Sequence, residues 1–299
     1  GKKKRRNKTR RGTSIMVLKE YISLMRVRQW YKNLLVFLAL IFVGSAAQPG
    51  WFYLTCLGFI SLSCMSSVGY IINDIVDLNA DRAHPEKRSR PLASGKIKKG
   101  GAIILMLILF TISLYLAQYL GINFLYAVIS LFVLTQFYSF FFKRIVFADI
   151  LVIAILFVIR AVSGVYIINV EISMWLILCP FFLSLFLSTG KRRSNLVLLK
   201  EKAAETKKVL QYYTVELTDS LILISTTLFI ISYTLYCFLS DHNHLIYTLP
   251  FALYVIFRYF YLIKSGSIIA RHPEKIRKDI PIVLGILLWI ISVIVILYI

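Results

Sequence analysis

The feature that most constrains this chain is a series of long apolar stretches that recur at near-regular intervals. Nine of them lie at about 34–47, 51–72, 101–119, 122–142, 145–168, 174–190, 219–240, 246–263 and 280–299. A membrane-spanning α-helix needs roughly 20 apolar residues, and tilt or flanking residues let slightly shorter stretches span as well. The pattern predicts an all-α membrane protein, with a nine-helix transmembrane bundle that occupies residues 16–299 as one domain.

Among the connections between these stretches, only alternate ones contain Lys or Arg. The chain has 35 Lys and Arg against 14 Asp and Glu, a formal net charge of +21. The connections around 48–50, 121, 169–173 and 241–244 contain no Lys or Arg. Because Lys and Arg are enriched in cytoplasmic loops, we expect a plasma or inner membrane protein with its N-terminus in the cytoplasm and its C-terminus outside. This topology accounts for the charge without a nucleic-acid partner.

The first residues and the cysteines add little chemistry. Residues 1–15 begin with a dense basic run that is too polar to fold alone, so a disordered cytoplasmic arm is expected there, with no secretory signal peptide. The four cysteines lie inside apolar stretches without C-x-x-C spacing, which indicates neither a zinc site nor a disulfide framework.

An acidic stripe follows the second apolar stretch. Asp74, Asp77 and Asp81 are spaced i, i+3 and i+7, so they share one face of a helix, and Asn73 precedes Asp77 by one turn. At an effective dielectric near 20, bare carboxylates roughly 5 to 6 Å apart repel each other by about 3 kcal/mol per pair. A divalent cation removes this cost, and Mg²⁺ is usually held by one or two carboxylates plus substrate phosphates. We therefore interpret the three aspartates as catalytic residues that bind Mg²⁺ together with Asn73.

Cationic side chains come directly after the stripe, at Arg82, Lys87, Arg88 and Arg90. Acidic metal ligands followed by phosphate-binding side chains are typical of a site for a diphosphate-bearing substrate. The alternative is a solvated helix end with mixed charges. The substrate site is favoured because the stripe continues a hydrophobic span, where charges are expensive.

Most of the other candidate substrate-binding residues lie at stretch ends predicted to be cytoplasmic; Arg160 lies deeper, inside the stretch 145–168. They are Arg28, Lys32, Asn33, Tyr138, Lys143, Arg160, Lys191 and Arg192. The Lys191-Arg192 pair either grips a phosphate or is a basic flank that sets topology; the phosphate is favoured because the following loop already supplies enough cations. Asp149 and Arg160 share a helix face, since eleven residues are about three turns, so either they pair with each other or Arg160 meets a substrate anion.

Other functional classes fit poorly. The chain has no G-x-x-x-x-G-K-[ST] motif for a P-loop and no G-x-S-x-G motif for a hydrolase. A transporter would be expected to place polar residues on broken helices through the membrane midplane. The ionisable residues here gather at one predicted face instead.

The motif Asn73-Asp74-x-x-Asp77-x-x-x-Asp81, in a chain of nine apolar stretches, resembles the UbiA superfamily of intramembrane transferases from Arg26 onward. The resemblance implies a helical bundle whose cytoplasmic-facing cavity binds Mg²⁺ and a diphosphate. Most members transfer a prenyl group and have a second Asp-rich motif after the sixth helix. This chain has Gly190-Lys191-Arg192 at that place.

That basic replacement is similar to the branch of decaprenyl-phosphate phosphoribosyltransferases. The similarity also covers two other segments, Arg28-Gln29-Trp30-Tyr31-Lys32-Asn33 and Arg160-Ala161-x-x-Gly164. It implies transfer of 5-phosphoribose from phosphoribosyl diphosphate (PRPP) to a polyprenyl phosphate, with Lys191 and Arg192 on the 5-phosphate. The branch usually has an acidic residue where this chain has Asn195. The rival is a prenyltransferase that uses an isoprenoid diphosphate; a homo-oligomer is compatible with either.

Overall fold

The computed structural model describes residues 18–44, 48–83, 87–199, 208–240 and 243–298, and within those ranges every regular element is a helix. The all-α prediction is confirmed for this part of the chain. The predicted basic arm, residues 1–15, lies outside the described residues.

Eight helices in the described ranges are long and apolar enough to cross a membrane. They are α3 (Trp51–Val76), α5 (Lys99–Leu120), α6 (Ile122–Phe140), α7 (Ala148–Ile168), α8 (Met174–Leu199), α10 (Val215–Leu239), His244–Lys264, which ends in α11 (Leu249–Lys264), and α13 (Ile280–Tyr298). Each overlaps one predicted stretch. The remaining stretch, 34–47, begins within a 3₁₀-helix, η1 (Val27–Phe37), and continues into the short α2 (Leu38–Phe42), so a ninth span stays a prediction.

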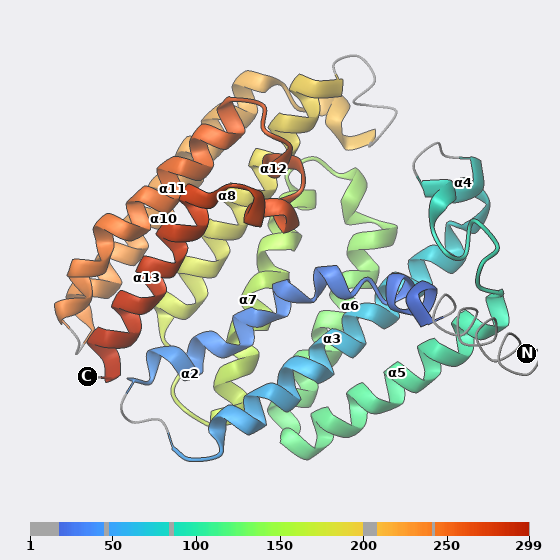
Figure 1. Cartoon of the computed structure of the whole chain (residues 1–299), viewed down its shortest axis with the longest axis horizontal. Helices are drawn as coiled ribbons and strands as arrows, with labels where there is room; N and C mark the ends of the chain where they lie inside the picture. The colour runs from blue at the N-terminus through green and yellow to red at the C-terminus, as the bar shows by residue number, and fades with distance from the viewer. Residues whose placement is uncertain (1–17, 45–47, 84–86, 200–207, 241–242, 299) are drawn as a thin grey trace, which may run out of the picture.

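Short helices connect the long ones. They are α4 (Leu78–Ala83), η3 (Lys87–Ser89), η4 (Phe142–Arg144), η6 (Lys208–Tyr212), η7 (Asn243–Thr248), α12 (Ile268–Arg271) and η8 (Pro273–Lys278). Two of them, α4 and α12, lie toward the same end of the bundle, the upper end in Figure 1.

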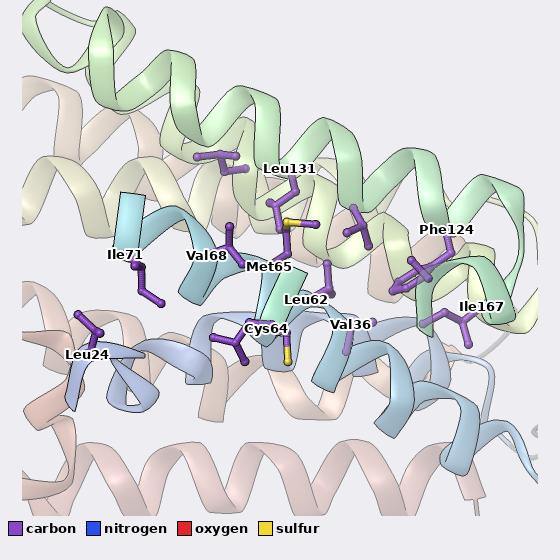
Figure 2. Packing of buried hydrophobic residues seen from close by; sticks show 14 of the residues in the cluster. Leu24, Val36, Leu62, Cys64, Met65, Val68, Ile71, Phe124, Leu131 and Ile167 are labelled. Carbon is purple, nitrogen blue, oxygen red and sulfur yellow. The ribbon is translucent and has the colours of Figure 1, made fainter. Parts of the chain in front are cut away.

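Helix α3 is the centre of the first half of the bundle. Its buried Leu62, Met65 and Val68 belong to a core that also contains Val36 of η1 and Leu131 of α6 (Figure 2). Small polar residues let the neighbouring helices approach closely. The hydroxyls of Ser61 on α3 and Ser113 on α5 each donate to the other residue's carbonyl oxygen at 2.8 Å. These bonds join the two helices inside an apolar environment.

The second half of the bundle has its own core. Phe186 of α8, Ile222 of α10, Ile263 of α11 and Ile282 of α13 are buried in one cluster. Helices α7 and α8 pack against each other and join the halves. The site residues described below come from both halves, so this junction positions them.

Helix α7 and η1 approach each other closely at Gly164. A Cβ atom there would lie 2.1 Å from the carbonyl oxygen of Val36, which is backbone and cannot swing aside. Only glycine fits this contact, and it sets the position of η1 and of the polar residues that η1 carries.

Gly164→Ala should therefore destabilise the protein, because η1 and α7 must separate. We expect a loss of about 1–3 kcal/mol, the usual cost of overpacking, measured by thermal unfolding in detergent. Gly100→Ala is the matched control, since nothing lies within 4 Å of the Cβ it would add. Equal stability of the two variants would contradict the close approach.

Candidate functional site

Two of the three predicted aspartates meet at the end of α3. Asp74 on α3 and Asp81 on α4 are each 2 % exposed. The backbone N–H of Asp77 donates to the carbonyl of Asn73 at 2.9 Å and that of Asp81 to the carbonyl of Asp77 at 2.8 Å, so the chain stays nearly helical across the junction. The i, i+7 spacing then brings both carboxylates to one place, as the sequence predicted.

Arg90 bridges these carboxylates. Its Nη1 lies 3.1 Å from Asp74 Oδ1 and also bonds Asp81 Oδ2. Lys87 adds a longer contact, with its Nζ 3.8 Å from Asp81 Oδ1. Two buried carboxylates share one cationic nitrogen, which relieves the repulsion expected from their spacing.

Arg26 is a site residue that sequence reasoning missed. Its guanidinium bonds Asp74 Oδ1 and lies 4.9 Å from the centre of the Tyr70 ring. The Arg26 backbone is left-handed, with φ 51°, a conformation that L side chains rarely adopt. Arg26 was not among the predicted site residues, because nothing in its spacing predicts this turn.

The other predicted metal ligands have different neighbours. Asn73 donates from Nδ2 to Ser139 Oγ at 2.9 Å, which joins α3 to α6. Asp77 is half-buried and serves as the C-cap of α3. Among the described residues, no three His, Cys, Asp or Glu side chains gather as a metal site.

The Asp74 and Asp81 carboxylates fit a magnesium ion nevertheless. Both are hard oxygen donors, and both reach a single positively charged nitrogen of Arg90. Mg²⁺ typically takes one or two carboxylates and completes its shell with water and substrate phosphate. Asp74 and Asp81 would hold the ion here, and Arg90 would give up its bridging position.

The second group of charged residues, called the basic group below, is built around two lysines. Lys32 on η1 and Lys191 on α8 are within electrostatic range of each other, and Arg271 acts on Lys191. Among the described residues, neither ammonium forms an ion pair within 4.0 Å. Arg26 acts on both Asp74 and Lys32, so the acidic and basic groups are neighbours.

Arg160 lies beside the lysines, but hydrogen bonds fix it. Its Nε donates to Asn33 Oδ1 at 2.9 Å and its Nη1 to the carbonyl of Leu156 at 2.7 Å. Asn33 in turn donates to Ser63 Oγ at 3.1 Å. These buried groups tie η1 to α7 and α3, so they hold Lys32 in place and add positive potential.

Arg192 is in an ion pair rather than free for substrate. Its Nε donates to Asp149 Oδ2 at 2.8 Å, and the Tyr213 hydroxyl donates to Asp149 Oδ1 at 2.7 Å. Tyr138 also interacts with the Arg192 side chain. One of the two possibilities considered for Asp149, a pair with Arg160, is therefore wrong. Asp149 pairs with Arg192 of α8 instead, and reasoning about the faces of α7 alone could not predict a contact with another helix.

The remaining predicted residues are placed at the bundle surface or have other partners. Arg28, Arg82 and Arg88 are exposed, and Lys143 in η4 is half-buried. Asn195 accepts a hydrogen bond from Arg271 Nε at 2.9 Å, so it orients a cation near Lys191. A cavity of about 230 Å³ between α6 and α7 is lined by other residues: Asn123, Tyr126, Ala127, Ser130, Ile159, Val162 and Tyr166.

Lys32 loses its charge at a lower pH than an ordinary lysine. Burial and the charges of Arg160 and Arg26 lower its pKa from 10.5 to about 8. Only the protonated ammonium attracts a phosphate, so anion binding should be strongest below about pH 8 and weaken as the pH rises through that value.

This can be measured as the affinity for ribose 5-phosphate, whose phosphate is the group that Lys32 would hold, between about pH 7 and 9. Lys32→Arg should flatten the profile, because a guanidinium stays charged over this range. An unchanged profile in Lys32→Arg would show that another group titrates.

Comparisons with known proteins identify the family of this chain. The sequence profile of the UbiA prenyltransferase family matches residues 33–274. Decaprenyl-phosphate phosphoribosyltransferase of Mycolicibacterium smegmatis is 33% identical over 288 residues, which cover 90% of this chain and 89% of that protein. The protein of the same name from Mycobacterium tuberculosis is 30% identical over 281 residues, 91% of this chain and 92% of the relative.

Among solved structures, a UbiA homolog from Archaeoglobus fulgidus bound to GPP and Mg²⁺ has the same fold. Its TM-score is 0.72 at 19% identity, over 93% of this chain and 99% of that one. The family profile spans most of the sequence, and the motif around Asp74 and Asp81 lies inside the matched region. The chain is thus a membrane-embedded member of the UbiA prenyltransferase family.

Proposed function

We propose that this protein transfers 5-phosphoribose from PRPP to a polyprenyl phosphate and releases diphosphate, with Mg²⁺ as cofactor. Two relatives that match about nine-tenths of the chain carry the name decaprenyl-phosphate phosphoribosyltransferase. A family neighbour was solved with a diphosphate ester and Mg²⁺. The name and the ligands belong to those proteins; what supports the transfer to this chain is the charge layout.

The observation that carries the proposal is the presence of two neighbouring groups of cationic side chains. Arg26, Arg90 and Lys87 surround the carboxylates of Asp74 and Asp81. Lys32 and Lys191 form the second group. PRPP has a diphosphate at one end and a phosphate at the other, whereas an isoprenoid diphosphate has one anionic end. A second cationic group is needed only for the first kind of donor.

The chain's residues can support the reaction in a simple way. The C1–O bond to the diphosphate breaks, and a new bond forms between C1 and an oxygen of the polyprenyl phosphate. When bound, Mg²⁺ supplies stabilisation of the charge on the departing diphosphate. Arg26, Lys87 and Arg90 share that charge, and Lys32 and Lys191 hold the 5-phosphate. The acceptor phosphate is already ionised at neutral pH, so no general base is required.

We also propose that the site faces the cytoplasm, in a cavity of a nine-span bundle whose C-terminus is outside. The connections without Lys or Arg, around 121 and 169–173, lie at the opposite end of α6 and α7 from Lys143. This asymmetry supports the orientation through the positive-inside rule. The residues 16–299 would then form the single catalytic domain.

The test is an assay of membranes that contain the protein, given labelled PRPP and a polyprenyl phosphate. A ribosylated lipid should form with Mg²⁺ and be lost after chelation and in Asp74→Ala and Asp81→Ala. Turnover of an isoprenoid diphosphate with an aromatic or lipid acceptor, without a product from PRPP, would establish the prenyltransferase alternative instead.

A further inference from the structure

Glu274 is an acidic residue within electrostatic range of Lys32 and Lys191. It lies in η8, between α12 and α13, and η8 packs against η1. Its charge acts on Lys32 and Lys191 and on the phenols of Tyr31 and Tyr259. Three elements that are far apart in the sequence, η1, α8 and η8, thus bring opposite charges close to one another.

These opposite charges do not meet. Glu274 Oε1 is hydrogen-bonded to His272 Nδ1 at 3.1 Å. Among the described residues, no Lys or Arg nitrogen lies within 4.0 Å of the carboxylate. The carboxylate is held by its neighbour in η8, and it stays within electrostatic range of Lys32 and Lys191 without forming an ion pair with either.

A carboxylate beside a phosphate site needs an explanation, because it repels anions. It cannot hold a phosphate, and it is not paired with the lysines. A carboxylate accepts hydrogen bonds, and its two oxygens suit two adjacent hydroxyl groups. Between its anionic ends, PRPP has such a pair, the 2- and 3-hydroxyls of the ribose. An isoprenoid chain has no donor at all.

We propose that Glu274 accepts hydrogen bonds from the ribose hydroxyls of the donor, held in place by His272, and thereby selects a phosphorylated pentose. This inference rests on the proposed function and adds a specificity residue to it. The metal and phosphate groups bind the two ends of the donor, and Glu274 recognises the sugar between them. No bond is made or broken at Glu274.

Glu274→Gln distinguishes this role from a purely electrostatic one. Loss of a charged acceptor should raise the KM for PRPP about tenfold or more. The inhibition by inorganic diphosphate with Mg²⁺, which has no hydroxyls to offer, should change less than about twofold. If Glu274 acted only as a negative charge near the lysines, both PRPP and diphosphate would bind more tightly, and the proposal would be overturned.

Two controls keep the test decisive. Glu20→Gln removes a carboxylate that pairs with Lys96 at 2.8 Å outside the site, and it should leave the KM unchanged. If Glu274→Gln does not fold, competition on the unsubstituted protein replaces it. Ribose 5-phosphate should then compete about tenfold better than 2-deoxyribose 5-phosphate, and equal competition would overturn the proposal.

Failure of the inference differs from failure of the proposed function. If the unsubstituted protein forms no lipid product from PRPP, the function itself is wrong. If it forms the product and Glu274→Gln keeps the same KM, only the assignment of Glu274 fails.

Discussion

Asp74→Asn should lower the rate of transfer by about two to three orders of magnitude, the effect seen when one preorganised electrostatic group is removed from an active site. Asparagine has nearly the same shape, but it has no charge to hold a cation. Asp74 is buried and in contact with both Arg26 and Arg90, so its charge organises the whole acidic group. Initial rates at saturating PRPP, over a series of Mg²⁺ concentrations, measure the loss.

The matched control for Asp74→Asn is Asp219→Asn. Asp219 also contacts two cations, Arg193 and Lys264, but it lies on α10 in a separate ion-pair group. Its substitution should change the rate by less than about threefold, because Asp219 and its two partners belong neither to the acidic group nor to the Lys32–Lys191 pair. A similar loss of rate in both variants would mean that general destabilisation is being measured.

The second large effect is expected from the double substitution Lys32→Met and Lys191→Met. A hydrogen bond to a charged group contributes about 1.5–3 kcal/mol, so removal of both ammonium groups should raise the KM for PRPP at least a hundredfold. Methionine keeps the length and apolar volume of the lysine stem. The effect should appear in KM more than in kcat, because the 5-phosphate does not change during the reaction.

Lys96→Met is the control for charge removal, since Lys96 is exposed and paired with Glu20. Its KM should match that of the unsubstituted protein. Inhibition by inorganic diphosphate should be weakened far less than PRPP binding in the double variant, because diphosphate needs only the acidic group and its cations. Equal weakening of both ligands would show one undivided anion site and would favour a prenyl donor.

Local sequence patterns predicted the parts of the site that depend on a single helix. The spacing of Asp74 and Asp81 was enough to place both carboxylates together, since the chain stays nearly helical between them. The apolar stretches predicted the long helices for the same reason. The interval between Lys32 and Lys191 carries no such pattern, so the sequence did not predict that these two lysines lie within electrostatic range of each other.

The parts that were missed depend on contacts between distant elements. Arg26 reaches Asp74 through a left-handed turn, and Arg192 pairs with Asp149 across two helices. Glu274 enters from a short 3₁₀-helix near the end of the chain. No periodicity within one segment contains this information, because each contact is set by packing.

The hydrogen bonds between η1 and α3 follow from their different windings. Trp30 Nε1 donates to Ser67 Oγ at 3.1 Å, and Asn33 Nδ2 donates to Ser63 Oγ at 3.1 Å. Three residues of a 3₁₀-helix and four of an α-helix both advance about 6 Å, so the two antiparallel rows stay in step. An insertion of one residue between Lys32 and Asn33 would rotate Lys32 by about a third of a turn and carry it away from Lys191. The two hydrogen bonds thus fix the number of residues between Trp30 and Asn33.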